Sequence, residues 1–192
     1  MTKYICETEQ AKYRRAYQLS NYKMGGDRLR DAKNDLIFAA EQGCWTHLDV
    51  GCGRGEMLDY GRELGMTSSG VEIVPALAAN REDVIIGGAS EIVELFGKET
   101  FDLVTCFDVL EHLPPGSEVP AIQAIRDVAI RCAVVTANNK PSMNGGDNLH
   151  INIKPYDDWD SIIRIIFYGW NVEFIKTTYS PTWRAWRYNS ED

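Results

Sequence analysis

A glycine-rich turn between a strand-like run and a helix-like run constrains this chain more than any other feature. Residues 45–50 are mostly apolar, and Gly51, Gly53 and Gly55 follow them directly. Residues 56–64 then have the character of a helix, which Gly65 closes. A buried strand that enters such a turn and continues as a helix opens a βαβ unit, in which small residues let a ligand approach the backbone closely. We therefore expect a ligand at this turn.

Strand-like and helix-like segments alternate along the rest of the chain. The expected strands cover 45–50, 69–73, 84–86, 101–107 and 133–136, and 172–175 with 183–188 form a closing antiparallel pair. The expected helices cover 5–20, 28–42, 56–64, 75–80, 90–96, 120–130 and 157–168. Because the strands lack alternating polarity, they predict a mostly parallel sheet that helices cover on both faces. Ligands of such sheets bind at the carboxyl ends of the strands.

Length, charge and cysteine content exclude several classes of protein. A chain of 192 residues fits one domain, here divided into an N-terminal helical lid over 1–44 and a core over 45–192. The net charge of −8 argues against broad binding of nucleic acid. Five cysteines without metal-type spacing indicate free thiols. The chain has neither a long apolar run nor a signal-like start, so we expect a cytoplasmic monomer or homodimer without a membrane partner.

The glycine-rich turn allows three kinds of ligand, and one acidic residue separates them. A phosphate-binding P-loop ends in Gly-Lys-Ser/Thr, which residues 54–56 do not provide. A dinucleotide fingerprint requires a third glycine where Glu56 stands. A carboxylate at the start of the helix repels a pyrophosphate there. The turn therefore favours a cofactor without phosphates, beside an acid near the strand end, Asp49.

The segment Leu48-Asp-Val-Gly-Cys-Gly-Arg-Gly55 resembles motif I of the class I S-adenosylmethionine-dependent methyltransferases. The resemblance runs from about residue 45 to residue 136. It implies a Rossmann-like, seven-stranded, mostly parallel sheet with an antiparallel C-terminal strand, and S-adenosyl-L-methionine as the cofactor. It also implies that Asp49 helps to position the methionine ammonium and that Gly51, Cys52 and Gly53 lie under the cofactor.

Two further strand ends supply expected cofactor contacts. Glu72 ends the second strand, where a carboxylate can accept hydrogen bonds from both hydroxyls of a ribose, and Ile73 follows it. After the third strand, the family usually has an acid that contacts the adenine amino group, but Gly88 occupies that position here. We therefore expect the backbone of Ala89, together with Ser90, to contact adenine.

The segment Phe107-Asp-Val-Leu-Glu-His-Leu113, after the fourth strand, resembles the family's D-V-L-E-H-L segment. Phe107 and Asp108 are expected to line the cofactor near its methyl group. Asp108 and His112 are four residues apart, so a helical turn would place them on one side. His150 lies beyond the fifth strand. It is expected at the same rim of the sheet, which is the edge formed by the carboxyl ends of the parallel strands and the turns that follow them. Asp108, His112 and His150 are the candidate catalytic residues, and the two histidines are also candidates for contact with the substrate.

The roles of the two histidines remain open between a general base, hydrogen bonding and metal binding. We expect no metal in the main interpretation. The alternative is a divalent ion held by Glu111, His112 and His150, an arrangement similar to that of the metal-dependent small-RNA 2′-O-methyltransferases. Asp108 replaces one glutamate of that family's motif, and the paired histidines of that family are absent.

Further expectations concern the N-terminal segment and the loop over 140–157. Arg28 opens the helix that leads to the motif strand and is expected to pair with the methionine carboxylate. Tyr17 and Tyr22 are expected to cover the cofactor and contact the substrate, and the loop over 140–157 to gate the site.

The sequence thus predicts a methyltransferase that moves a methyl group to an oxygen or nitrogen of a small polar molecule or nucleotide unit. One alternative is a metal-assisted enzyme similar to the RNA 2′-O-methyltransferases. Two others are a non-catalytic S-adenosylmethionine-binding subunit and a nicotinamide oxidoreductase, and Glu56 argues against the last of these. Neither the acceptor nor its reacting atom follows from the sequence.

Overall fold

The computed structural model describes residues 26–144, 147–177 and 180–188. Its helices are α2 (Gly26–Glu41), α3 (Glu56–Glu63), α4 (Pro75–Ala78), α5 (Ile92–Phe96), the 3₁₀ turn η1 (Leu110–His112), α6 (Glu118–Val128) and α7 (Tyr156–Ile166). Its strands are β1 (Thr46–Val50), β2 (Thr67–Glu72), β3 (Val84–Ile86), β4 (Phe101–Cys106), β5 (Ala129–Thr136), β6 (Met143–Asn144), β7 (Asp147–Asn148), β8 (Asn171–Ile175) and β9 (Thr182–Trp186).

Seven strands form one sheet in the order β3-β2-β1-β4-β5-β9-β8. The first five strands are parallel to one another, whereas β9 runs antiparallel to both β5 and β8. The predicted fold class, with its antiparallel C-terminal strand, is therefore confirmed. The strand order reverses at β1, because β2 lies on one side of it and β4 on the other. Ligands of open α/β sheets bind at such a reversal, outside the carboxyl ends of the strands, which here are those of β1 and β4.

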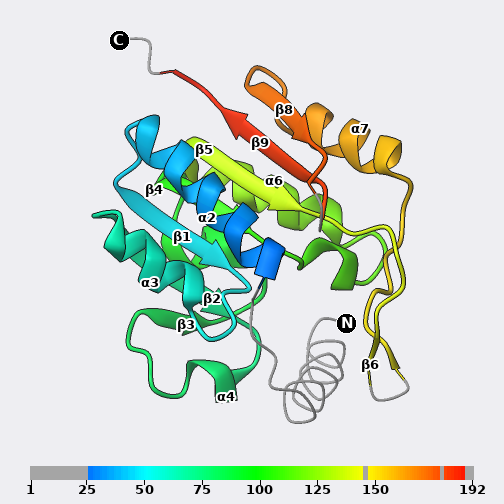
Figure 1. Ribbon diagram of the computed structural model, residues 1–192, viewed down its shortest axis with the longest axis horizontal. Helices are drawn as coiled ribbons and strands as arrows, with labels where there is room; N and C mark the ends of the chain where they lie inside the picture. Colours follow the sequence, from blue (N-terminus) through cyan, green and yellow to red (C-terminus); the bar gives the residue numbers. More distant parts are fainter. Residues whose placement is uncertain (1–25, 145–146, 178–179, 189–192) are drawn as a thin grey trace.

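Helices cover both faces of the sheet (Figure 1). A separate apolar core fills each face. On one face, α2 and α3 bury Ala32, Leu36 and Met57 against β4 and β5. On the other face, α5, α6 and α7 bury residues such as Ile125 and Trp159. Burial on both faces explains why the strands read as continuous apolar runs.

Three local predictions need correction. β5 begins at Ala129 rather than at residue 133, so the preceding helix ends two residues earlier than its predicted end at Ile130. Within the predicted loop over 140–157, β6 and β7 form a short antiparallel pair. The expected helical turn does not reach back to Asp108, whose φ of 53° is left-handed; only Leu110–His112 is helical.

The N-terminal helix over 5–20, Tyr17 and Tyr22 lie outside the described residues. The lid predicted for residues 1–44 stays a prediction; α2, which lies within that range, packs on the sheet. Among the described helices, none combines the length and the apolar character needed to cross a membrane.

Candidate active site

The glycine-rich turn between β1 and α3 has the conformation that its glycines predict. Gly51, Gly53 and Gly55 have φ values of 76°, 56° and 87°, in the region that favours glycine. The Gly51 N–H donates to the Val71 carbonyl at 2.8 Å. A Cβ on Gly51 would lie only 2.3 Å from Cγ2 of Val109, which follows β4. The turns after β1 and β4 are thus in direct contact, and glycine is required at position 51.

Asp49 lies at the end of β1 and is 4% exposed. The Thr105 hydroxyl donates to Asp49 Oδ1 at 2.6 Å, and Thr105 Oγ1 lies 2.8 Å from His47 Nε2. Because the Thr105 proton is directed at Asp49, its oxygen accepts the His47 Nε2 proton. His47 Nδ1 then accepts from the Ser68 hydroxyl at 3.2 Å. Three donors on neighbouring strands are therefore aligned toward one carboxylate.

Burial is the main cause of the pKa shifts of Asp49 and His47. It raises the pKa of Asp49 to about 7, against the hydrogen bond from Thr105, and the carboxylates of Glu72 and Glu56 add to the rise. Burial also lowers the pKa of His47 to about 3, so the imidazole is neutral. Asp49 is consequently a carboxylate that a nearby cation would stabilise strongly.

Glu72 ends β2 and is also 4% exposed. Its Oε2 accepts the Gly53 N–H at 2.9 Å, and its Oε1 accepts the Val74 N–H at 2.8 Å. Burial raises its pKa despite these two donors. Each carboxylate oxygen retains acceptor capacity, so the group is oriented to accept two neighbouring hydroxyls.

The remaining predicted cofactor residues occupy the turns beside these carboxylates. Ala89 and Phe107 are buried, Ile73 is half-buried and Ser90 is exposed. Cys52 is buried, and its N–H donates to the Val71 carbonyl at 3.1 Å. These residues line the rim, and the glycine turn with two buried carboxylates fits a cation that carries a ribose. Glu56 and Asp59 in the first turn of α3 disfavour phosphates.

Asp108 and Arg28 come together as an ion pair. Oδ1 of Asp108 accepts from the hydroxyls of Thr136 at 3.2 Å and Ser180 at 3.0 Å, and its backbone N–H donates to Thr136 Oγ1 at 2.7 Å. The predicted pairing of Arg28 with the methionine carboxylate stays a prediction; in this structure Arg28 forms an ion pair with Asp108. This pair lines a small pocket between α2 and the ends of β4, β5 and β9. No local sequence pattern signals the pairing, because the two residues are 80 positions apart.

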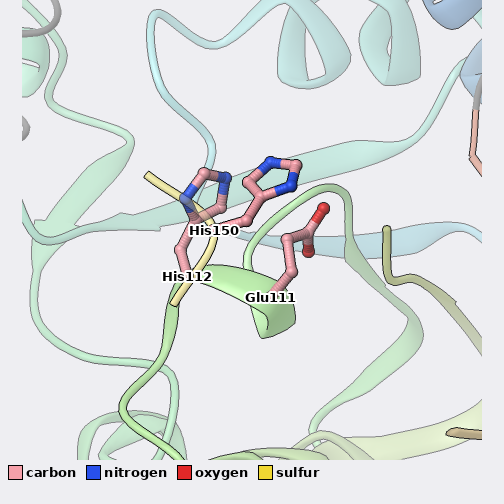
Figure 2. Close-up of side chains that lie close together, drawn as sticks. All are labelled: Glu111, His112 and His150. Atoms are coloured by element: carbon pink, nitrogen blue, oxygen red, sulfur yellow. The ribbon is translucent and has the colours of Figure 1, made fainter. Parts of the chain in front are cut away.

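His112 and His150 lie edge to face, with ring centroids 4.7 Å apart. Figure 2 shows both rings beside the Glu111 carboxylate, above η1. His112 Nδ1 lies 2.9 Å from the Leu149 carbonyl, and His150 Nδ1 bonds the Lys140 carbonyl. A carbonyl only accepts, so both Nδ1 atoms carry a proton, and in the neutral form of each imidazole the lone pair is on Nε2.

Glu111 is fully buried beneath these rings. Its backbone carbonyl accepts the N–H groups of Ile151 and Asn152, both at 3.0 Å, which fixes the segment that carries His150. Oε1 accepts the Asn138 N–H at 3.2 Å, whereas Oε2 has no hydrogen-bond partner among the described residues. Burial, reinforced by the nearby Asp108 charge, raises the pKa of Glu111 well above its usual range.

A family model described as a methyltransferase domain matches residues 13–128. The chain belongs to this methyltransferase family. The family match confirms the predicted superfamily and class of enzyme. It also agrees with the predicted cofactor.

Two curated relatives are ubiquinone biosynthesis O-methyltransferases. The one from Thiobacillus denitrificans is 36% identical over 83 residues, covering 38% of this chain and 36% of the relative. The one from Paracidovorax citrulli is 37% identical over 87 residues, with the same coverage. The chain thus spans little more than a third of the length of these relatives.

Solved structures show the same fold at low identity. Magnesium protoporphyrin IX methyltransferase from Synechocystis PCC 6803, solved with bound S-adenosylhomocysteine, has a TM-score of 0.65 at 17% identity. That match covers 96% of this chain and 97% of the other. An S-adenosylmethionine-dependent methyltransferase from Archaeoglobus fulgidus has a TM-score of 0.64 at 18% identity, over 83% of this chain and 94% of the other.

Proposed function

We propose that this chain transfers the methyl group of S-adenosylmethionine to a hydroxyl of a small polar molecule or nucleotide unit. The observation that carries the proposal is the pair of buried carboxylates at adjacent strand ends, Asp49 and Glu72, on either side of the glycine turn. One suits an ammonium and the other a ribose diol. The relatives named as O-methyltransferases support oxygen as the acceptor atom.

S-adenosylmethionine supplies an activated methyl group when it is bound. The residues of the rim then orient the acceptor and accept its proton. The bound cofactor would supply the methyl group to the acceptor oxygen, and the hydroxyl proton would pass to Nε2 of His112 or His150. The carbonyl contacts of His112 and His150 leave that nitrogen with its lone pair, which is the form that a general base requires.

The test separates donor binding from acceptor identity. Calorimetry with S-adenosylmethionine and S-adenosylhomocysteine should show binding to the wild-type protein, and NAD should show none. Labelled S-adenosylmethionine with catechols, other phenols and ribonucleosides then identifies the acceptor class. Replacement of His150 by Ala should lower kcat while donor affinity is kept. Donor binding without methyl transfer to any of these acceptors, or to any component of a cell extract, would instead support a non-catalytic subunit.

A second candidate is metal-assisted methylation of a ribose 2′-hydroxyl, and one observation favours it. Ligand atoms of Glu111, His112 and His150 lie within 4.8 Å of one another. His112 and His150 each direct Nδ1 at a backbone carbonyl, a contact typical of metal-binding histidines, in which the other ring nitrogen binds the ion. One carboxylate with two imidazoles suits a first-row divalent ion such as Mn²⁺ or Co²⁺.

Direct binding of metal distinguishes the two candidates. Addition of Co²⁺ to the wild-type protein should produce visible ligand-field absorption that His150→Ala removes, if the second candidate holds. Loss of methyl transfer after EDTA, with recovery on added Mn²⁺, should accompany it. Full activity in EDTA and no Co²⁺ spectrum would leave the imidazole base as the mechanism.

A further inference from the structure

In the turn after β3, the Glu91 carboxylate lies beside Gly87 and Gly88, which have no side chains to occupy that space. Glu91 Oε2 accepts the Gly88 N–H at 2.7 Å, and the Glu91 N–H donates to the Gly88 carbonyl at 3.0 Å. These two bonds close a ring between the residues and fix the direction of the Glu91 side chain. A Cβ on Gly88 would lie 3.3 Å from Glu91 Oε2, and a Cβ on Gly87 would lie 3.6 Å from it. The carboxylate therefore occupies the space that a side chain at position 88 would fill.

This turn lies on the same rim as Glu72. The Gly87 N–H donates to the Glu72 carbonyl at 3.1 Å, and Ile86 is the register partner of Glu72 across β2 and β3. A ligand whose ribose binds the Glu72 carboxylate thus has its base beside the turn over 87–91. The exocyclic amine of adenine is a hydrogen-bond donor, and it requires an acceptor there.

We propose that Glu91 determines base specificity by accepting a hydrogen bond from the adenine amino group, in place of the missing acid at Gly88. The inference rests on the proposed donor, S-adenosylmethionine. Oε2 is oriented by Gly88, while the side chain as a whole is exposed, so the carboxylate keeps acceptor capacity toward a ligand. The absence of a side chain at position 88 is what gives Glu91 access to this space.

The experiment compares two ligands that differ in the substituent at purine position 6 and in the proton that the 6-oxo purine carries on N1. Calorimetry gives the Kd of S-adenosylhomocysteine, which has an amine there, and of S-inosylhomocysteine, which has a carbonyl oxygen. The wild-type protein should prefer the adenosyl compound. Glu91→Ala should weaken the binding of the adenosyl compound by about tenfold or more, the loss expected for a hydrogen bond to a charged group. The same variant should leave the binding of the inosyl compound unchanged. The ratio of the two Kd values should therefore collapse.

Two further variants make the test specific. Gly88→Asp in the Glu91→Ala background should restore the preference for adenine, because the atoms nearest to a Cβ at position 88 belong to Glu91 and are removed in this background. Glu94→Ala, an exposed acid on α5, is the matched control and should leave the ratio unchanged. Thermal melting without ligand shows whether each variant is folded.

The outcomes separate this inference from the function on which it rests. If Glu91→Ala weakens both ligands equally, Glu91 only supports the turn and the inference is wrong. An unchanged ratio with unchanged affinities also overturns it, while donor binding by the wild-type protein still stands. If the wild-type protein binds neither compound, the proposed function fails, and the inference fails with it.

Discussion

Replacement of Asp49 by Asn should stabilise the protein without cofactor and weaken cofactor binding. Burial raises the pKa of Asp49 from 3.8 to about 7. An acid with a raised folded pKa contributes no penalty below the unfolded pKa, and its penalty grows as the pH rises toward the folded value. At about 1.4 kcal/mol for each pKa unit, the ionised group costs roughly 4 kcal/mol above pH 7 and about 1–2 kcal/mol at pH 5. Asn removes this cost and still accepts the Thr105 proton.

Urea unfolding of the protein without cofactor measures the first effect. The stability gain of Asp49→Asn over wild type should increase from pH 5 to pH 8. Asp59→Asn is the control, because Asp59 is exposed and its hydrogen bond with Arg81 lowers its pKa. That variant should lose a little stability, with no gain at high pH.

Calorimetry with S-adenosylmethionine measures the second effect. Wild-type affinity should rise by up to tenfold for each pH unit between about 5.5 and 7, because Asp49 must lose its proton to face an ammonium. Asp49→Asn should bind about 10- to 100-fold more weakly at pH 7, with little pH dependence over this range. The reasoning is refuted if Asp49→Asn is less stable than wild type at pH 8, or if its donor affinity is unaltered.

Three further predictions concern the same rim. Gly51→Ala should cost about 2 kcal/mol or more in urea unfolding, because φ is 76° and the new Cβ meets Val109; adding Val109→Ala should recover part of this loss, and no recovery would disprove the clash. Thr105→Val removes the donor to Asp49, so the pH midpoint of donor binding should move upward, whereas Thr105→Ser should leave it in place. Glu72→Ala should weaken S-adenosylhomocysteine by about tenfold while sparing homocysteine-sized fragments that lack the ribose, and equal losses for both ligands would contradict the assignment.

Most of the fold was predictable because its signals are local. The strand, turn and helix around Gly51 follow from apolar runs and glycine positions, and the structure reproduces them within two residues. The start of β5 was not predictable. Residues 129–132 continue the apolar pattern of the preceding helix, and their strand conformation depends on pairing with β4, where the register shifts between Phe101 and Leu103. Pairing between distant segments leaves no local trace in one sequence.

The candidate site divides in the same way. Asp49 and Glu72 were identified from their places at strand ends, which the fold fixes. Glu91 was missed because its role depends on a side chain that turns back toward Gly88, three residues earlier. The sequence shows only a departure from the family pattern at Gly88, and the compensation becomes visible with side-chain coordinates.

The acidic residues of the rim fall into two groups according to their ionic and hydrogen-bond partners, not according to residue type. Asp108 is neutralised by Arg28 and held by two hydroxyls. Asp49 and Glu72 accept hydrogen bonds from a hydroxyl and from backbone N–H groups, all of them neutral donors, and burial raises the pKa of both. A cationic ligand at their strand ends therefore gains attraction that a neutral or anionic ligand does not.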